Sequence, residues 1–141
     1  MQKRIFRGMM AGMVGLYRRT GGSFGGKVGG LSVLLLTTSG RKTGKKYTTP
    51  LGFFEDQGAF VICASNAGAD QHPGWFRNLQ HDPHVEIEIK KQHLTARAEV
   101  ASGAERQRLW DRLTALAPNY LNYVKKTTRE IPMIILHPER S

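Results

Sequence analysis

The sequence predicts one small antiparallel β-barrel with a few helices, a mainly β domain of the α+β class spanning residues 1–141. Three observations lead to this fold class. Six strand-like segments follow one another in a meander-like order, turn residues join several of them directly, and the helical segments are short and few. A chain of this length suits one domain with a real hydrophobic core, and no composition shift marks a boundary within it.

The first 30 residues predict a helix and a linker. Ile5, Met9, Met13 and Leu16 recur at helical spacing within residues 1–19, with basic residues at the ends. We expect a retained amphipathic helix that packs on the core or rests on a membrane surface. Residues 20–30 are rich in glycine and match no phosphate-binding loop motif, so they are expected to form a linker.

Three strands are expected next. The apolar run LSVLLLTTS, residues 31–39, is typical of a buried strand. The segment YTTPLGFFE, residues 47–55, predicts a second strand in which Pro50 indicates an edge or a bulge. The turn residues Asp56-Gln57-Gly58 then lead into a third strand, AFVICAS, residues 59–65.

A short helix is expected from Pro73 to just before Pro83. In the following strand, residues 84–90, alternation directs Val85, Ile87 and Ile89 inward and turns Glu86, Glu88 and Lys90 outward. A further alternating strand covers residues 93–100.

The C-terminal part predicts two helices and a last strand. Ser102 to Glu105 reads as a capping box, and the apolar stripe of the helix after it is expected to be Leu109, Trp110, Leu113 and Leu116. Pro118 ends that helix, a second helix starts in NYLNYVKK, and residues 131–138 form a buried strand.

The charge indicates an anionic partner. Lys and Arg total 21 and Asp and Glu total 11, so the net charge is 21 − 11 = +10. Such a balance attracts nucleic acid, an anionic membrane, or a phosphorylated or carboxylated small molecule. Four of the basic residues, Arg41, Lys42, Lys45 and Lys46, crowd the connection GRKTGKKYTTP between two strands. This connection is either an anion-binding turn, aided by the hydroxyls of nearby threonines, or a solvated hairpin tip.

Two further segments could take part in a site. ASNAGADQHPGWFRNL leaves a strand, crosses small residues and enters a helix that carries Trp75 and Arg77. Tyr120 and Tyr123 share one face of a helix and could donate a proton, although half-buried packing explains them as well. The single Cys63 excludes an internal disulfide, and the histidines show no metal-binding spacing. With no nucleophile motif either, the chemistry would come from a cofactor.

Three segments carry a family resemblance: LLLTTSGRKTGKKYTTPLGF, ASNAGADQHPGWFRNLQHDPHVEIEIK and NYLNYVKKTTREIPMIILHP. In order and spacing they resemble the deazaflavin-dependent nitroreductase and quinone reductase family of actinobacteria. The resemblance runs from Leu31 to the end of the chain. It implies a split β-barrel, similar to flavin mononucleotide (FMN)-binding proteins, that uses reduced coenzyme F-420. The implied reaction is hydride transfer to a quinone, a nitroaromatic compound or an enone.

The resemblance also implies site residues. Arg41, Lys42 and Thr43 would bind the phosphate and acidic tail of the coenzyme, next to Tyr47. Tyr120 and Ser65 are the implied proton donors, with Tyr123 beside them. The deazaflavin ring would lie against the remaining implied residues: Thr48, Thr49, Pro50, Leu51, Gly52, Cys63, Ala64, Ser65, Asn66, Gly74, Trp75, Phe76, Arg77, Asn78 and Tyr120. Ala117 stands where some members have a further tyrosine, which leaves nitroimidazole reduction open.

Other readings remain at this point. An FMN-dependent oxidoreductase on the same barrel, or a noncatalytic binder of a cofactor or lipid, would share the basic turn. A nucleic-acid-binding barrel fits the charge, but the strands lack the aromatic pattern that stacks bases, so no specific nucleic acid is expected. We expect a cytoplasmic location, with peripheral contact of residues 1–19 at the inner face of the plasma membrane as an alternative. Monomer and homodimer are both open.

Overall fold

The computed structural model describes residues 14–15, 18, 27–28 and 31–139. Its strands are β1 (Lys27–Val28), β2 (Leu31–Ser39), β3 (Lys46–Asp56), β4 (Ala59–Cys63), β5 (His84–Ile89), β6 (Gln92–Val100) and β7 (Met133–Pro138). Its helices are the 3-10 turn η1 (Asn66–Gly68), α2 (Gly74–His81), α3 (Gly103–Leu116) and α4 (Tyr120–Val124). The six predicted strands and the helices at 74–81, 103–116 and 120–124 are confirmed.

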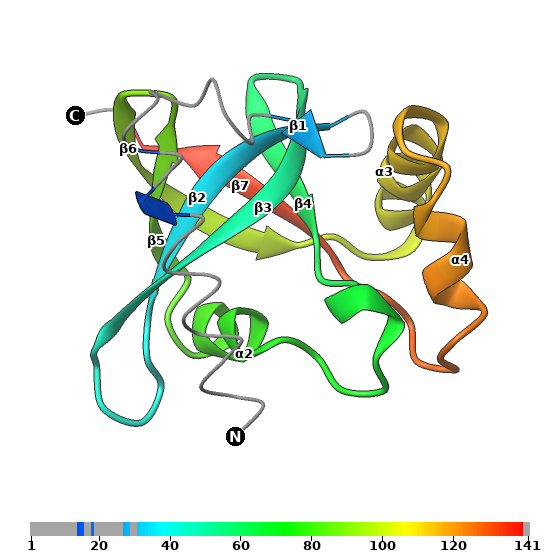
Figure 1. Cartoon of the computed structure of the whole chain (residues 1–141), viewed down its shortest axis with the longest axis horizontal. Coiled ribbons are helices and arrows are strands. Elements are labelled where there is room, and N and C mark those ends of the chain that lie inside the picture. Colours follow the sequence, from blue (N-terminus) through cyan, green and yellow to red (C-terminus); the bar gives the residue numbers. More distant parts are fainter. Residues whose placement is uncertain (1–13, 16–17, 19–26, 29–30, 140–141) are drawn as a thin grey trace.

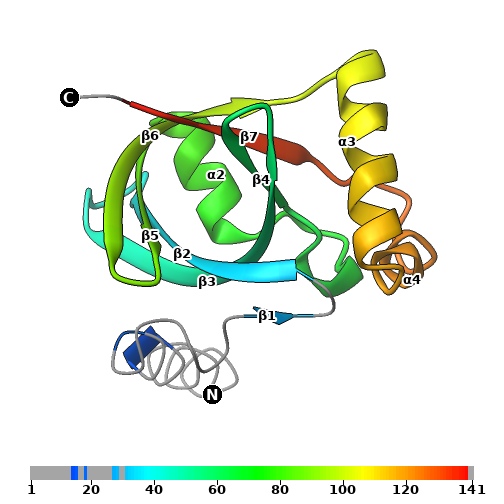
Figure 2. The same ribbon diagram turned by 90° about the horizontal axis from the view of Figure 1, so that it is seen from above.

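The strands form one closed antiparallel barrel. Their order is β1-β2-β3-β4-β7-β6-β5, and an additional pairing of β2 with β5 closes the ring. Seen from above, the strands form a ring, and α2 lies across its far end (Figure 2). Helices α3 and α4 lie together on one side of the barrel, against the β4 and β7 side (Figure 1). The prediction of a small antiparallel barrel is therefore confirmed.

The barrel is split along β3. From Lys46 to Phe53 this strand pairs with β2, and only from Phe54 to Asp56 does it pair with β4. Within the described ranges, the other edge of its first eight residues thus has no partner strand. Pro50 lies in this one-sided stretch, opposite Leu35, where a missing backbone N–H costs no ladder hydrogen bond on the open side. The open edge leaves backbone groups free for another partner.

Two apolar cores hold the elements together. The first fills the barrel and buries one face of α2 through Trp75, Phe76 and Leu79. The second lies between the outside of the barrel and helix α3, around Leu109 and Leu113, and the rings of α4 pack against it. Because α2 and α4 rest on different cores, the barrel wall fixes the relative position of the two helices.

The outer face of β2 is covered as well. Val33 and Leu35 are buried together with Val14, so both faces of the apolar run are shielded from water. Val14, Gly15 and Arg18 are helical, as predicted, and the rest of the expected helix 1–19 lies outside the described residues. Most of the expected linker 20–30 also lies outside them. Its described residues Lys27 and Val28 form β1, paired with the start of β2, where a loop was expected.

Three local predictions are corrected. Glu88 is 7% exposed rather than outward in solvent, because Arg18 covers it with an ion pair of 3.0 Å. The capping box does not form: Ser102 makes no capping hydrogen bond, and Gly103 at φ +58° interrupts the expected geometry. Leu116 is 44% exposed, since the helix ends there and its last turn extends past the core.

Among the described residues, no helix is both long enough and apolar enough to cross a membrane.

Candidate functional site

The basic turn between β2 and β3 has its own backbone hydrogen bonds. The Gly40 amide donates to the Lys45 carbonyl at 2.6 Å, and the Gly44 amide donates to the Gly40 carbonyl at 2.8 Å. Gly44 has φ +74°, which glycine adopts without strain. A side chain at Gly40 would lie 2.7 Å from the Tyr47 ring, so this ring covers the start of the turn.

The turn is anchored to helix α2 by one buried amide. Asn78 Oδ1 accepts from the Arg41 guanidinium at 2.9 Å and from the Arg41 backbone amide at 3.3 Å. Its Nδ2 donates to the hydroxyl of Thr38, which is 1% exposed. Asn78 therefore ties the end of β2, the basic turn and α2 together.

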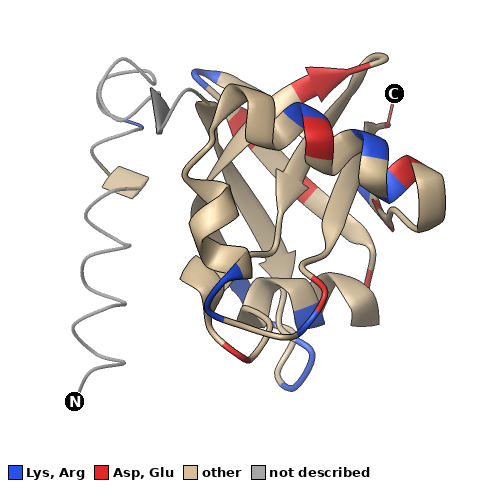
Figure 3. Cartoon of the chain, turned by 90° about the vertical axis from the view of Figure 1, so that its right-hand side faces the viewer, with Lys and Arg blue, Asp and Glu red and all other residues tan. Residues whose placement is uncertain are grey.

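The charges of the turn are largely uncompensated. Lys46 pairs with Glu86 at 2.7 Å, but no carboxylate among the described residues pairs with Arg41, Lys42 or Lys45. Lys and Arg also dominate the lower end of the molecule, on this turn and on the segment after α4, whereas both signs mix on α3 (Figure 3). Exposed, unpaired cations at one end of the open β3 edge favour an anionic ligand there.

The other end of the open edge lies beside α4. A Cβ atom on Gly52 would be 3.0 Å from Leu31 Cδ1, which is a tight contact, and 3.6 Å from the Tyr120 hydroxyl, so this hydroxyl lies next to the strand backbone. The rings of Tyr120 and Tyr123 pack edge to face with centroids 5.3 Å apart. Between Lys46 and Gly52 the strand covers about 20 Å, at about 3.3 Å per residue.

The Tyr120 hydroxyl keeps its proton at neutral pH. Burial, followed by the neighbouring Cys63 and Tyr123, raises its pKa to about 12. Cys63 itself is buried in β4, and burial raises the pKa of its thiol to about 12, so it stays a neutral core residue. The arrangement therefore offers a protonated phenol as a hydrogen-bond or proton donor, and no thiolate.

The remaining implied residues occupy different depths. Thr48, Thr49, Pro50 and Leu51 are half-buried along the open edge, and the Thr48 hydroxyl is 2.8 Å from that of Thr37. Ala64 and Ser65 are buried, whereas Thr43, Asn66, Gly74 and Arg77 are exposed. Trp75 and Phe76 are 8% and 2% exposed and belong to the barrel core. Their rings thus support the wall of the site from behind.

Sequence reasoning missed Arg129, His72 and the true role of Gly68. Arg129 donates to the carbonyls of Ala64, Ser65 and Ala69, and it contacts His72 Nδ1. Gly68 is one of the small residues in the predicted site segment, and the atoms nearest to a Cβ at this position would belong to Lys126 and Tyr123. No local pattern marks these contacts, because the partners of Arg129 lie 57 to 65 residues away in the sequence.

Two surface hollows of about 290 and 340 Å³ lie elsewhere. The first is lined by Arg18, Glu88 and His93 on the outside of β5 and β6. The second is lined by Asp56 of β3, Glu99 of β6 and His137 of β7. None of the residues implied by the resemblance lines either hollow. The open edge of β3 remains the better candidate because it combines unpaired cations, free backbone groups and a protonated tyrosine.

This edge suits an extended ligand with an anionic tail. Free cations lie at one end, Tyr120 lies at the other, and the strand between them offers backbone groups along its length. The second hollow contains several carboxylates and would repel such a tail. The residues present therefore fit a phosphorylated, polyanionic cofactor.

Comparisons with known proteins agree with this fit. Residues 10–138 match the family model described as F420H(2)-dependent quinone reductase. An F420H(2)-dependent quinone reductase of Mycobacterium tuberculosis is 37% identical over 125 residues, which cover 86% of this chain and 84% of the relative.

Two solved structures are also similar. A structure described as F420-H2 dependent reductase is 34% identical, with a TM-score of 0.69, and the match covers 74% of this chain and 93% of that one. A second, described as a domain-swapped dimer, has the same identity and TM-score and matches over 79% of its length. The chain belongs to the F420H(2)-dependent quinone reductase family.

Proposed function

We propose that this protein oxidises reduced coenzyme F-420 and reduces a quinone, with the coenzyme lying along the open edge of β3. The observation that carries the proposal is the pairing of two features on one strand. Lys42 and Lys45, which pair with no carboxylate in the described part of the chain, stand at one end of this edge, and the protonated Tyr120 hydroxyl stands beside Gly52 at the other.

The basic turn would hold the phosphate and acidic tail. Lys42 and Lys45 are exposed and free to form charge-assisted hydrogen bonds, which are stronger than neutral ones. Arg41 is held by Asn78, so part of its guanidinium is already committed, and the rest can still attract an anion. The turn needs little reordering on binding, because its backbone hydrogen bonds and its anchor exist without the ligand.

When bound, the reduced coenzyme supplies a hydride, which reduces a quinone to its hydroquinone once one proton is added. Tyr120 would donate that proton from its hydroxyl to a quinone oxygen and recover it from solvent. A pKa raised to about 12 keeps the hydroxyl protonated before transfer. Ser65 is a second donor candidate, and Tyr123 supports the Tyr120 ring edge to face. The buried rings of Trp75 and Phe76 would keep the wall behind the ligand dry.

The finer features of the partners are part of the proposal. Quinones are the expected acceptors, and nitroaromatic compounds and enones are the next candidates. We also propose a cytoplasmic location, with peripheral contact of residues 1–19 at the inner face of the plasma membrane as the alternative. The similar structure described as a domain-swapped dimer supports testing a homodimer.

The test is anaerobic stopped-flow oxidation of reduced coenzyme F-420 with menadione as acceptor. We expect turnover by the wild type, a rate at least tenfold lower for Tyr120→Phe, and coenzyme affinity within about threefold of wild type. Glu139→Gln, directly after the end of β7, serves as the control and should match the wild type. Failure to oxidise the reduced coenzyme, or tighter binding and turnover with FMN, would contradict the proposal.

A further inference from the structure

Arg129 makes an unusually complete set of contacts with the loop between β4 and α2. Its Nε donates to the Ala69 carbonyl at 2.8 Å, and its Nη2 donates to the Ser65 carbonyl at 2.7 Å. Its Nη1 donates to the Ala64 carbonyl at 3.2 Å and lies 3.1 Å from His72 Nδ1. A guanidinium has five N–H groups, and these contacts engage four of them.

The loop that Arg129 holds has little structure of its own. Asn66 and Ala67 have φ of +48° and +54°, a conformation that non-glycine residues rarely adopt. Its internal backbone hydrogen bonds are those of one short turn, from Gly68 to Ser65 and from Ala69 to Asn66. Among the described residues, the carbonyls of Ala64 and Ala69 therefore accept only from Arg129, and the Ser65 carbonyl accepts from Arg129 in addition to the Gly68 amide. Without it, the loop would lose its main restraint.

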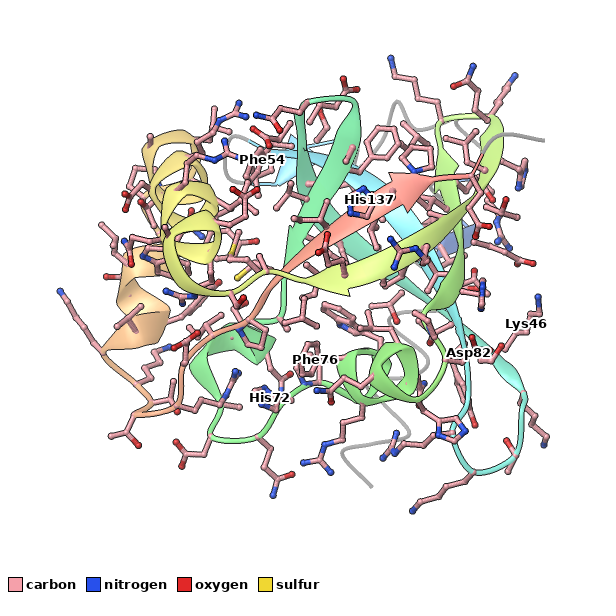
Figure 4. The ribbon with its side chains drawn as sticks, turned by 180° about the vertical axis from the view of Figure 1, so that it is seen from behind. Lys46, Phe54, His72, Phe76, Asp82 and His137 are labelled. Atoms are coloured by element: carbon pink, nitrogen blue, oxygen red, sulfur yellow. The ribbon has the colours of Figure 1, made fainter. Side chains whose placement is uncertain are left out.

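His72 completes the arrangement. Arginine can only donate, so Nδ1 of His72 must accept, and neutral His72 carries its proton on Nε2. The His72 ring also packs against Phe76 with centroids 4.8 Å apart, at the start of α2 (Figure 4). Burial, then the charges of Arg129 and Arg77, lowers the pKa of His72, which favours this neutral form. Arg129 is thereby connected to α2 as well as to the loop.

The same loop positions helix α4. A Cβ on Gly68 would lie 3.0 Å from Lys126 Cβ and 3.1 Å from the Tyr123 carbonyl, so the loop backbone packs directly against the end of α4. Gly68 also has φ +82°, which favours glycine. Helix α4 carries Tyr120 and has no fully buried residue. The loop thus supports α4, and with it the Tyr120 hydroxyl, together with the packing of the α4 rings on the second core.

We infer that Arg129 is a positioning residue for the reaction: it fixes the loop 64–72, and through Gly68 it fixes α4 and the Tyr120 hydroxyl. The inference rests on the proposed function for its kinetic consequence only. Among the described residues, Arg129 forms no hydrogen bond with the open edge of β3. Its removal should therefore lower the rate of reduction while the basic turn still binds the coenzyme tail.

The experiment compares Arg129→Lys with wild type and with Lys91→Gln. Lysine keeps the charge but cannot reach three diverging carbonyls, so charge alone should not rescue the enzyme. We expect at least a tenfold lower rate of hydride transfer to menadione, with coenzyme affinity changed less than threefold. Lys91 is an exposed cation on the β5–β6 turn, away from the loop and from α4, and its variant should behave as wild type.

Two measurements on the ligand-free protein are independent of activity. Amide hydrogen exchange of Gly68 and Ala69 should accelerate at least tenfold in Arg129→Lys, with β2 and β5 unchanged. The His72 ring, followed by NMR, should titrate at a higher pH in Arg129→Gln, because one cation that lowers its pKa is gone. In Gly68→Ala, the added methyl group would push Lys126 and the Tyr123 carbonyl away from the loop. This variant should therefore reproduce the rate loss with normal coenzyme affinity.

The outcomes separate the two proposals. Faster exchange in Arg129→Lys together with an inactive wild type would support the loop restraint and contradict the proposed function. Wild-type exchange and a wild-type rate in Arg129→Lys would overturn the inference. A loss of coenzyme affinity equal to the loss of rate would also overturn it, because Arg129 would then act on binding. If Arg129→Gln does not fold, Arg129→Lys and Gly68→Ala still test whether Arg129 is a positioning residue.

Discussion

Asn78 offers the sharpest test of whether the basic turn is a fixed site. The perturbation is Asn78→Ala, which removes three hydrogen bonds: two from Arg41 to Oδ1 and one from Nδ2 to Thr38. The contact from the partly exposed guanidinium contributes about 1 kcal/mol, and the two longer neutral contacts about 0.5 kcal/mol each. We therefore expect the free energy of unfolding to fall by about 2 kcal/mol. For a domain of this size, about 3 °C per kcal/mol gives a Tm lower by about 6 °C.

The functional consequence of Asn78→Ala should be a weaker tail site. A turn that is no longer held must be ordered by the ligand, and a cost of about 1.4 kcal/mol weakens binding about tenfold. The assays are urea denaturation and titration of coenzyme F-420 followed by tryptophan fluorescence. Gln80→Ala, exposed on the same helix, is the control. A double-mutant cycle with Arg41→Ala should give a coupling energy of about 1 kcal/mol.

The reasoning would be refuted by either of two results. Asn78→Ala could be no less stable than Gln80→Ala, which would mean that the amide does not hold the turn. Alternatively, the double-mutant cycle could show no coupling between Asn78 and Arg41, which would make their contact irrelevant in solution.

Two further predictions concern charge. The Asp56 side chain is 9% exposed and accepts hydrogen bonds from Arg108 at 2.8 and 3.0 Å and from Arg112. Asp56→Asn should therefore lower the free energy of unfolding by about 2 kcal/mol at pH 7. The Arg108 hydrogen bond holds the pKa of Asp56 below its ordinary 3.8. Its contribution is therefore present above that pH and is lost as the pH falls through the folded pKa; a gap between wild type and variant that persists in urea titrations at pH 2 would contradict this. His72 has a lowered folded pKa, so the unfolded chain binds its proton more readily, and wild type should lose stability relative to His72→Gln as the pH falls through 6.5. The same difference in free energy of unfolding between wild type and His72→Gln at pH 7.5 and at pH 5.5 would contradict the His72 prediction.

The sequence was sufficient for the barrel because its strands carry strong local signals. The apolar run of β2 and the alternation of β5 and β6 reappear as paired strands. Alternation identifies which side of a strand a residue points to, but it does not say what covers that side. Glu88 points outward as predicted and is still buried, because Arg18, 70 residues away, lies over it.

The candidate site was predictable where charge gathers locally and not where it depends on topology. Arg41 and Lys42 stand out in the sequence because four cations fall within six residues. Arg129 does not stand out, since its partners come near only when β4 and β7 pair. Trp75 illustrates the converse: only the family resemblance places it beside the ring, and the fold packs its side chain into the barrel core.

The most direct test of the central claim is the affinity of coenzyme F-420 for the double variant Lys42→Ala/Lys45→Ala. Two exposed cation–anion contacts are worth about 1.4 kcal/mol together, so the dissociation constant should rise about tenfold. The difference should shrink as the salt concentration rises, the Tm should not change, and Lys91→Ala on the β5–β6 turn should bind as wild type. Equal affinity of wild type and double variant at low salt would contradict the placement of the anionic tail on this turn.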